Sequence, residues 1–91
     1  MKHLFDNVSE KCSKITTRSY STSFSFGIKL LHKTIRQDVY NIYGFVRFAD
    51  EIVDSFHDYD KKILLDQFKK DTYNSIEAKI SLNPILNSFQ Q

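Results

Sequence analysis

Residues 34–57 read TIRQDVYNIYGFVRFADEIVDSFH and hold the longest helical pattern in the 91-residue chain. Apolar residues recur in this segment at steps of three and four, which places them on one face of an α-helix. These residues are Val39, Ile42, Val46, Ala49, Val53 and Phe56. A second stripe beside them also has helical spacing and consists of Tyr43, Arg47, Asp50 and Asp54. The segment therefore predicts one long helix that carries both stripes.

Helical patterns also precede this segment. A first helix of about four turns is predicted by the spacing of Leu4, Val8, Cys12 and Ile15. We expect it to end within residues 16–23, because their hydroxyl side chains compete for backbone hydrogen bonds and favour caps and turns. Residues 24–31 alternate as a short strand would, but no second strand is evident. We therefore expect a bent or helical connector there.

Two further helices are predicted near the C-terminal end. Asp60 is a suitable N-cap for a helix with Leu64, Phe68, Ile76 and Ile80 on its apolar face. Asn83 and Pro84 form a second helix start, since a proline at the first helical position sacrifices no hydrogen bond. The apolar face begun by Ile85, Leu86 and Phe89 stops at Gln91, so we interpret the chain as truncated. The expected fold class is all-α.

Composition limits the class of protein further. A chain of 91 residues suits a single domain, and one cysteine excludes an internal disulfide or a multi-cysteine zinc site. No stretch approaches the about 20 apolar residues of a membrane-spanning helix, and the first residues lack the pattern of a secretory signal. We expect a cytoplasmic protein. The formal charge of +2 comes from basic residues dispersed along the sequence without a clustered patch, which disfavours nucleic-acid binding.

The central helix carries the best candidate for chemistry. Asp50 and Asp54 lie one turn apart on one face, and Mg²⁺ is often held by one or two carboxylates together with substrate phosphates. A solvated helix face is the commoner reason for such a pair. Arg47 could bind phosphate through both guanidinium nitrogens, or it could simply pair with Asp50. Tyr43 is by default an aromatic residue at the edge of the core.

The hydroxyl-rich stretch at residues 19–23 has two interpretations. Its hydroxyl groups and backbone amides suit phosphate oxygens if they lie at a helix N-terminus. Simple helix capping explains the same residues without a ligand. The residues alone leave both interpretations open.

Three motifs in this order resemble the N-terminal portion of the squalene and phytoene synthase family. They are YSTSF at residues 20–24, LL at 30–31 and IYGFVRFADEIVD at 42–54. The NPILNSFQ run at residues 83–90 extends the resemblance over nearly the whole chain. Residues 1–91 are accordingly interpreted as the N-terminal part of one domain of this type.

The resemblance implies an isoprenoid synthase-type helical bundle that joins two farnesyl or geranylgeranyl diphosphates head to head. By position, Asp50 and Asp54 resemble the first aspartate-rich motif and would bind Mg²⁺, with Mn²⁺ as an alternative ion, while Arg47 would contact diphosphate. Tyr43 resembles an aromatic residue that lines the site. The segment that resembles the family's flap comprises Tyr20, Ser21, Thr22 and Ser23. The residues that would face the prenyl chain are Phe24 and Ile28.

The sequence also departs from the family pattern. Glu51 stands where many members have an aspartate, and His32 replaces the proline that usually follows the Leu-Leu pair. The second aspartate-rich motif of the family is absent after Asp54. We therefore expect a fragment that is inactive alone and whose partners include the missing C-terminal helices of its own parent chain.

Two further interpretations concern partners. A lipophilic product would allow peripheral membrane association of the parent enzyme. Alternatively, the chain is a small helical interaction protein without catalysis, whose apolar faces, including an uncovered Phe89 face, bind a partner helix. This alternative predicts cooperative unfolding of the isolated chain and no dependence on diphosphate.

Overall fold

The computed structural model describes residues 1–56 and 58–91, which form α-helices and no strand. The helices are α1 (Lys2–Tyr20), α2 (Thr22–Ile28), α3 (Lys33–Asp54), α4 (Lys61–Ala78) and α5 (Pro84–Gln90). The all-α prediction is confirmed, and the connector is a short helix. The long helix predicted around residues 34–57 is α3, which ends at Asp54. Phe56 therefore lies after the helix, and His57, where we predicted the helix to end, lies outside the described residues.

Polar side chains cap four of the five helices. Asp60 Oδ1 accepts a hydrogen bond from the Ile63 amide at 3.1 Å, and Asn83 Oδ1 accepts one from the Ile85 amide at 3.0 Å with Pro84 next to it. Both predicted caps are confirmed. His32 Nδ1 accepts from the Thr34 amide at 3.3 Å, so this residue caps α3 where the family pattern has proline. Ser21 is both the last cap of α1 and the N-cap of α2, with an extended backbone (φ −149°, ψ 96°).

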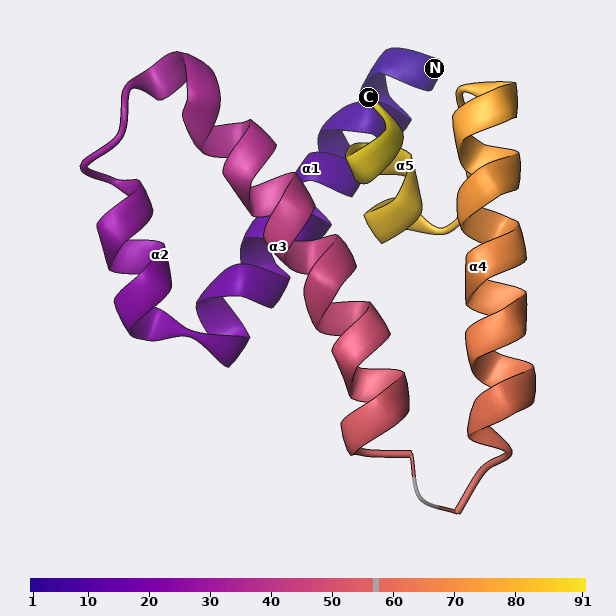
Figure 1. The fold of residues 1–91 in the computed structure, drawn as a ribbon. Helices are drawn as coiled ribbons and strands as arrows, with labels where there is room; N and C mark the ends of the chain where they lie inside the picture. Colours follow the sequence, from indigo (N-terminus) through magenta and orange to yellow (C-terminus); the bar gives the residue numbers. More distant parts are fainter. Residues whose placement is uncertain (57) are drawn as a thin grey trace.

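The helices pack around α1 and α3. Figure 1 shows α3 crossing α1, with α5 beside the N-terminal half of α1 and α4 running back along α3 after a turn. The helix α2 lies on the other side of α3 from α4 and packs against α1. This arrangement places the N-terminal half of α1 next to the C-terminal helix α5 and leaves the C-terminal half of α3 facing α4.

The buried face of α1 is polar and small. Ser9, Ser13 and Thr17 are fully buried, whereas three of the four residues of the predicted apolar face are exposed, namely Leu4, Val8 and Ile15. The predicted helix is present, but most of the apolar face that indicated it does not pack against the rest of the fold. The cause is the close approach of α3, because a Cβ atom added at Gly44 would lie 3.1 Å from Ser13 Oγ. Only small side chains fit at such a crossing.

The buried hydroxyl groups at this crossing are satisfied within the fold. Thr17 Oγ1 donates to the Ser13 carbonyl at 2.9 Å, and Ser9 Oγ donates to the Phe5 carbonyl at 2.9 Å. The hydroxyls of Ser13 and Ser88 share a hydrogen bond between α1 and α5. Burial of these polar groups is tolerated because each has a partner.

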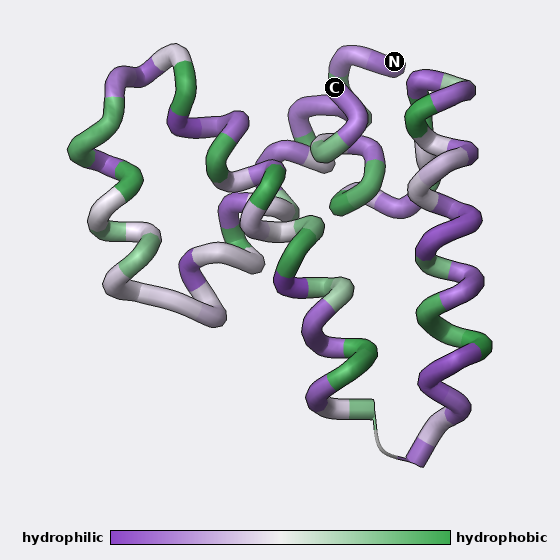
Figure 2. Tube along the Cα trace, viewed as in Figure 1, coloured by the Kyte–Doolittle hydropathy of each residue, from purple (hydrophilic) through white to green (hydrophobic). Residues whose placement is uncertain are grey.

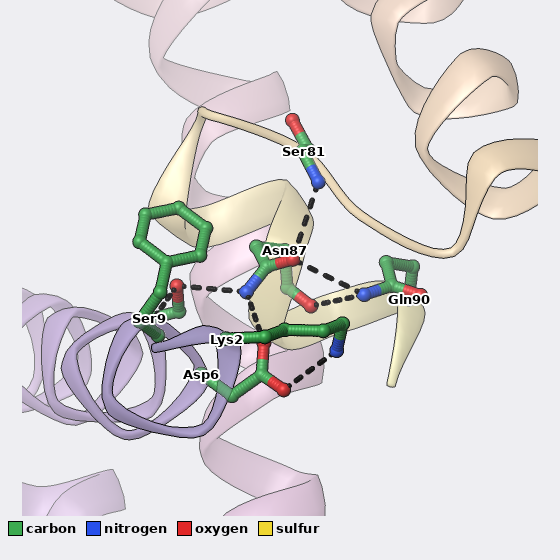
Figure 3. A network of polar contacts seen from close by, with 7 residues as sticks. Lys2, Asp6, Ser9, Ser81, Asn87 and Gln90 are labelled. Atoms are coloured by element: carbon green, nitrogen blue, oxygen red, sulfur yellow. Dashed lines mark hydrogen bonds and ion pairs between the residues drawn. The ribbon is translucent and has the colours of Figure 1, made fainter.

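Helix α5 is anchored by Asn87 (Figure 3). The Asn87 Nδ2 atom donates to Asp6 Oδ1 at 2.8 Å and to Ser9 Oγ at 3.0 Å, and its Oδ1 accepts from the Ser81 amide at 3.2 Å. The neighbouring Lys2 Nζ lies 2.7 Å from Asp6 Oδ2. The hydrogen bond from Lys2, followed by that from Asn87, lowers the pKa of Asp6 below the ordinary value of 3.8. This network joins the two ends of the described chain.

The aromatic side of α5 is partly covered by α3. The ring centroids of Phe89 and Phe45 are 4.0 Å apart, and Phe45 also stacks on Phe68 of α4 at 5.5 Å. Phe89 is thus half-buried, stacked on Phe45 on one side, and its ring still lines a groove of about 500 Å³ between α3, α4 and α5. Three side chains of the apolar stripe on α3 do remain exposed, which are Ile42, Val46 and Val53. Figure 2 shows hydrophobic and hydrophilic residues interspersed along the outer parts of α3 and α4.

Among the described residues, no helix has the length and apolar character needed to cross a membrane.

Candidate functional site

A cluster of aromatic side chains and one guanidinium forms where α1 and α2 meet α3. The rings of Phe24 and Tyr43 stack with centroids 5.0 Å apart. One turn further along α3, the Arg47 guanidinium carbon lies 5.1 Å from the centroid of the Tyr20 ring. The fold thus brings the YSTSF stretch against the stripe of α3 that begins at Tyr43 and Arg47, two segments that are distant in sequence.

The guanidinium of Arg47 bridges two carboxylates of α3. Its Nη2 atom lies 3.5 Å from Glu51 Oε2 and 3.8 Å from Asp54 Oδ2. Within the described part of the chain, the expected pairing with Asp50 is not formed, because the side chain extends along the helix toward residues four and seven positions later. The Nε atom of Arg47 is buried without a hydrogen-bond partner in the described residues. The guanidinium therefore retains an unused donor.

The environment of Tyr20 makes its hydroxyl harder to ionise. Loss of water around the group, followed by the negative charge of Glu51, raises the pKa of Tyr20 above its ordinary value of 10.0. The Arg47 charge opposes part of this effect. The residue is 52% exposed. A tyrosine with a pKa near or above 10 carries its proton at neutral pH, so the Tyr20 hydroxyl can donate a hydrogen bond.

The two aspartates of the predicted motif are open to solvent. Asp50 is exposed, and the Asp54 side chain is 65% exposed while it faces Arg47. No group of three potential metal ligands comes together among residues 1–56 and 58–91. The described residues therefore do not form a metal cage by themselves, and an ion held by Asp50 and Asp54 would need further oxygen ligands from water or substrate phosphates.

The remaining predicted residues divide between capping, the surface and the core. Ser21 Oγ accepts a hydrogen bond from the Phe24 amide at 3.1 Å, which confirms the capping interpretation for this residue. Thr22 and Ser23 are exposed in the first turn of α2. Ile28 is only 2% exposed and belongs to the core of the described residues, and its place facing a prenyl chain stays a prediction.

Comparison with known proteins gives one match. The family model described as squalene/phytoene synthase matches residues 17–91. The chain belongs to the squalene/phytoene synthase family. The matched range contains every candidate residue from Tyr20 to Asp54. No curated protein and no solved structure gives a significant match. Membership of the squalene/phytoene synthase family indicates a transferase of isoprenoid biosynthesis.

In this squalene/phytoene synthase chain, a pocket of about 390 Å³ lies next to the guanidinium cluster, between α3 and α4. Tyr20 and Glu51 belong to both the cluster and the pocket. The pocket is otherwise largely apolar, with polar side chains at Gln67 and Asp71, and its aromatic residues are Phe48, Phe56 and Phe68. Sequence reasoning did not assign these residues to a site because the position of α4 against α3 is a tertiary contact that has no local spacing signal.

Proposed function

We propose that this chain supplies part of the active site of a Mg²⁺-dependent prenyltransferase that joins two farnesyl or geranylgeranyl diphosphates head to head. The observation that carries the proposal is the position of Arg47. Its guanidinium lies between the Tyr20 ring and the Asp54 carboxylate, with its Nε donor unused. A diphosphate placed there would meet a cation and a neutral hydroxyl donor beside a carboxylate pair.

The residues of the cluster would have separate roles in this chemistry. Asp50 and Asp54, which are both exposed, would hold Mg²⁺, and the bound ion would offset negative charge on the leaving diphosphate. Arg47 would donate to diphosphate oxygens, and its contacts with Glu51 and Asp54 keep the guanidinium in place before substrate arrives. The Tyr20 hydroxyl would donate a further hydrogen bond.

The apolar surroundings would protect the reacting carbons. Ionisation of an allylic diphosphate leaves a carbocation, which water would quench. The stacked rings of Phe24 and Tyr43 and the aromatic wall of the 390 Å³ pocket are the surfaces of this chain that can exclude water. A prenyl tail would pack against the same surfaces through the hydrophobic effect.

Further helices are part of the proposal. Ile42, Val46 and Val53 form an exposed apolar stripe on α3, and exposed stripes of this kind mark surfaces that other elements cover. The carboxylate pair also lacks a facing acidic partner among the described residues. We infer that additional helices of the parent chain cover the stripe and supply the second metal-binding motif, and that the isolated chain is inactive.

A second candidate function rests on a different observation. A groove of about 500 Å³ between α3, α4 and α5 is lined mainly by apolar side chains, among them Phe45, Leu65 and Ile76. An apolar groove of this type can accept an amphipathic helix from a partner. In this case the chain would bind its partner equally well with and without diphosphate and Mg²⁺.

The decisive experiment uses the protein with its complete helical domain. Asp54→Asn is expected to reduce Mg²⁺-dependent turnover of farnesyl or geranylgeranyl diphosphate by about a hundredfold or more, because one ligand of the ion is lost. Asp66→Asn, an identical change at an exposed residue of α4, serves as the matched control and should leave turnover unchanged. Equal turnover in both variants would remove the metal-binding assignment.

A further inference from the structure

A second, strongly basic site lies at the junction of α1, α2 and α3. Its residues line a pocket of about 350 Å³. The cations around it are Lys14, Arg18, Lys29, Lys33 and Arg36, accompanied by Gln37 and Tyr40. Basic residues that are dispersed in the sequence are thus gathered by the fold, and the expectation of no clustered patch is wrong in three dimensions. The convergence arises because two turns of α1 meet the end of α2 and the first turn of α3.

The charges in this pocket are not balanced by acids. No carboxylate lines the pocket. The ion pairs found in the described residues use Lys2 and Arg47, so none of the five pocket cations is paired with an acid there. Five of the 13 basic residues therefore surround one hollow in a chain whose formal charge is only +2. Like charges at short range repel one another, and a bound anion would remove this repulsion.

The floor of the pocket is preorganised. Arg36 donates from Nε to the Leu31 carbonyl and from Nη2 to the Lys29 carbonyl, both at 2.8 Å. The Lys14 ammonium lies 5.7 Å from the centroid of the buried Tyr40 ring. These contacts hold two cations in position before a ligand arrives, while Lys29 and Lys33 are exposed at the rim. A preorganised cationic hollow loses less conformational entropy on binding than a set of free lysines does.

We propose that this basic pocket binds a phosphate group of two or more negative charges, of the monoester or diphosphate type. The concave shape favours a compact anion over an extended strand, and Arg and Lys are the residues that recognise phosphate oxygens. None of the pocket residues belongs to the Arg47 cluster, so this site is additional to the proposed function.

Two sources of the phosphate are compatible with the surroundings. A smaller hollow of about 250 Å³ shares Arg18 and Lys29 with the pocket and includes Phe26. Phe26 and Leu30 are exposed beside Lys29, with Leu30 83% exposed. Apolar side chains next to cations suit the headgroup region of an anionic lipid, whereas a free phosphate compound would use the cations alone.

The test compares two triple variants with the same loss of charge. The pocket variant replaces Arg18, Lys29 and Lys33 with Gln, and the control variant replaces the exposed Lys62, Lys69 and Lys70 of α4 with Gln. Binding of inorganic pyrophosphate is measured by calorimetry in the presence of EDTA, so that no metal-dependent binding at Asp50 and Asp54 contributes. Binding of vesicles is measured by co-sedimentation, with phosphatidylcholine alone and with added phosphatidylserine.

The pocket variant should bind at least one probe about tenfold more weakly than the wild type, while the control variant should bind it as the wild type does. Loss of pyrophosphate binding alone identifies a free phosphate compound. Loss of phosphatidylserine-dependent binding, reproduced by Leu30→Ser, identifies a lipid headgroup. Equal weakening in both variants, or no binding of either probe by the wild type, would overturn the proposal. Tighter binding of a single-stranded oligonucleotide than of both probes, abolished by the pocket variant, would also overturn it in favour of a nucleic-acid surface.

The folded state of the variants is checked independently. Because the substitutions remove repulsion at exposed positions, the unfolding temperature of the pocket variant without ligand should equal or exceed that of the wild type. A ligand that binds the native state raises the unfolding temperature. The effective probe should therefore raise it for the wild type and the control variant, and leave it unchanged for the pocket variant.

Discussion

The crossing of α1, α3 and α5 and the pairing of α3 with α4 are built in opposite ways. At the crossing, small hydroxyl side chains and Gly44 let backbones approach, and internal hydrogen bonds satisfy the buried polar atoms. Between α3 and α4, large aromatic rings meet and leave pockets of about 390 and 500 Å³, whereas the hollow beside the crossing, lined by Cys12 and Ile85 among others, is about 280 Å³. The same helix is thus clamped near its middle and open along its C-terminal half, where Arg47, Glu51 and Asp54 lie.

The middle of α3 thus stabilises the fold, whereas its C-terminal half carries the candidate site. The clamp fixes the direction of α3 relative to α1, and the position of Tyr20 on α1 follows from it. The open half leaves room for a ligand and for additional helices. If this division is correct, substitutions at the crossing will mainly change the free energy of unfolding, and substitutions on the open half will mainly change binding and turnover.

The largest effect on stability is expected for Gly44→Val. The added side chain would overlap Ser13 of α1, and overpacking of this kind costs about 3 kcal/mol of unfolding free energy. Gly27→Val is the matched control, because a Cβ at Gly27 has no atom within 4 Å. Urea unfolding, followed by circular dichroism, should show a lower free energy of unfolding for Gly44→Val and not for Gly27→Val. Equal stability of the two variants would show that the crossing is not tightly packed.

Asn87→Ala should have a slightly smaller effect. It leaves Asp6, Ser9 and the Ser81 amide without their partner, at a cost of about 2 kcal/mol. Asn74→Ala, at an exposed position of α4, is the corresponding control. If thermal unfolding places both variants within experimental error of the wild type, the network of Figure 3 does not anchor α5.

Phe45→Leu tests the aromatic region. The change keeps an apolar side chain but removes the stacking of the Phe45 ring on Phe68 and on Phe89. We expect the free energy of unfolding to fall by about 1 kcal/mol. Phe26→Leu, at an exposed ring, should be neutral. Urea unfolding provides the measurement. A loss as large as that of Gly44→Val would contradict the comparison, since it would mean that the open region is packed as tightly as the crossing.

The smallest effect is the pH dependence contributed by Asp6. Its pKa is lowered in the folded state, so its contribution to stability is fully present well above 3.8 and is lost as the pH falls through the folded pKa. The wild type should therefore exceed Asp6→Asn in unfolding free energy by more at about pH 6 than at about pH 2.5. Parallel pH profiles from urea titrations would show that the charge of Asp6 has no special role in the α1–α5 contact.

Much of the local structure was predictable from spacing and capping residues. Asp60, Asn83 and Pro84 mark helix starts by side-chain chemistry that acts within a few residues, and the structure confirms them. The buried face of α1 was not predictable in the same way. Ser13 lies inside where Gly44, far along the chain, allows close approach, and Ser9 lies against Asn87 of α5, and hydrophobic periodicity gives no signal for such contacts.

The candidate site shows the same division. The stripe of Tyr43, Arg47, Asp50 and Asp54 follows from helical geometry, but the choice of Glu51 rather than Asp50 as a partner of Arg47 depends on the rotamer of a long side chain. The pocket against α4 and the basic pocket depend on how helices are placed relative to one another. The relative placement of the helices is set by tertiary packing, and no local pattern in the sequence indicates it.

The junction of α1 and α2 has a consequence for sequence variation. Ser21 alone separates the two helices, and it ends one while it starts the other. An extra residue between Ser21 and Phe24 would turn the following side chains by about 100° around the axis of α2 and move the Phe24 ring off Tyr43. Insertions and deletions should therefore be selected against between Tyr20 and Phe24, where a single added codon would separate the Phe24 and Tyr43 rings.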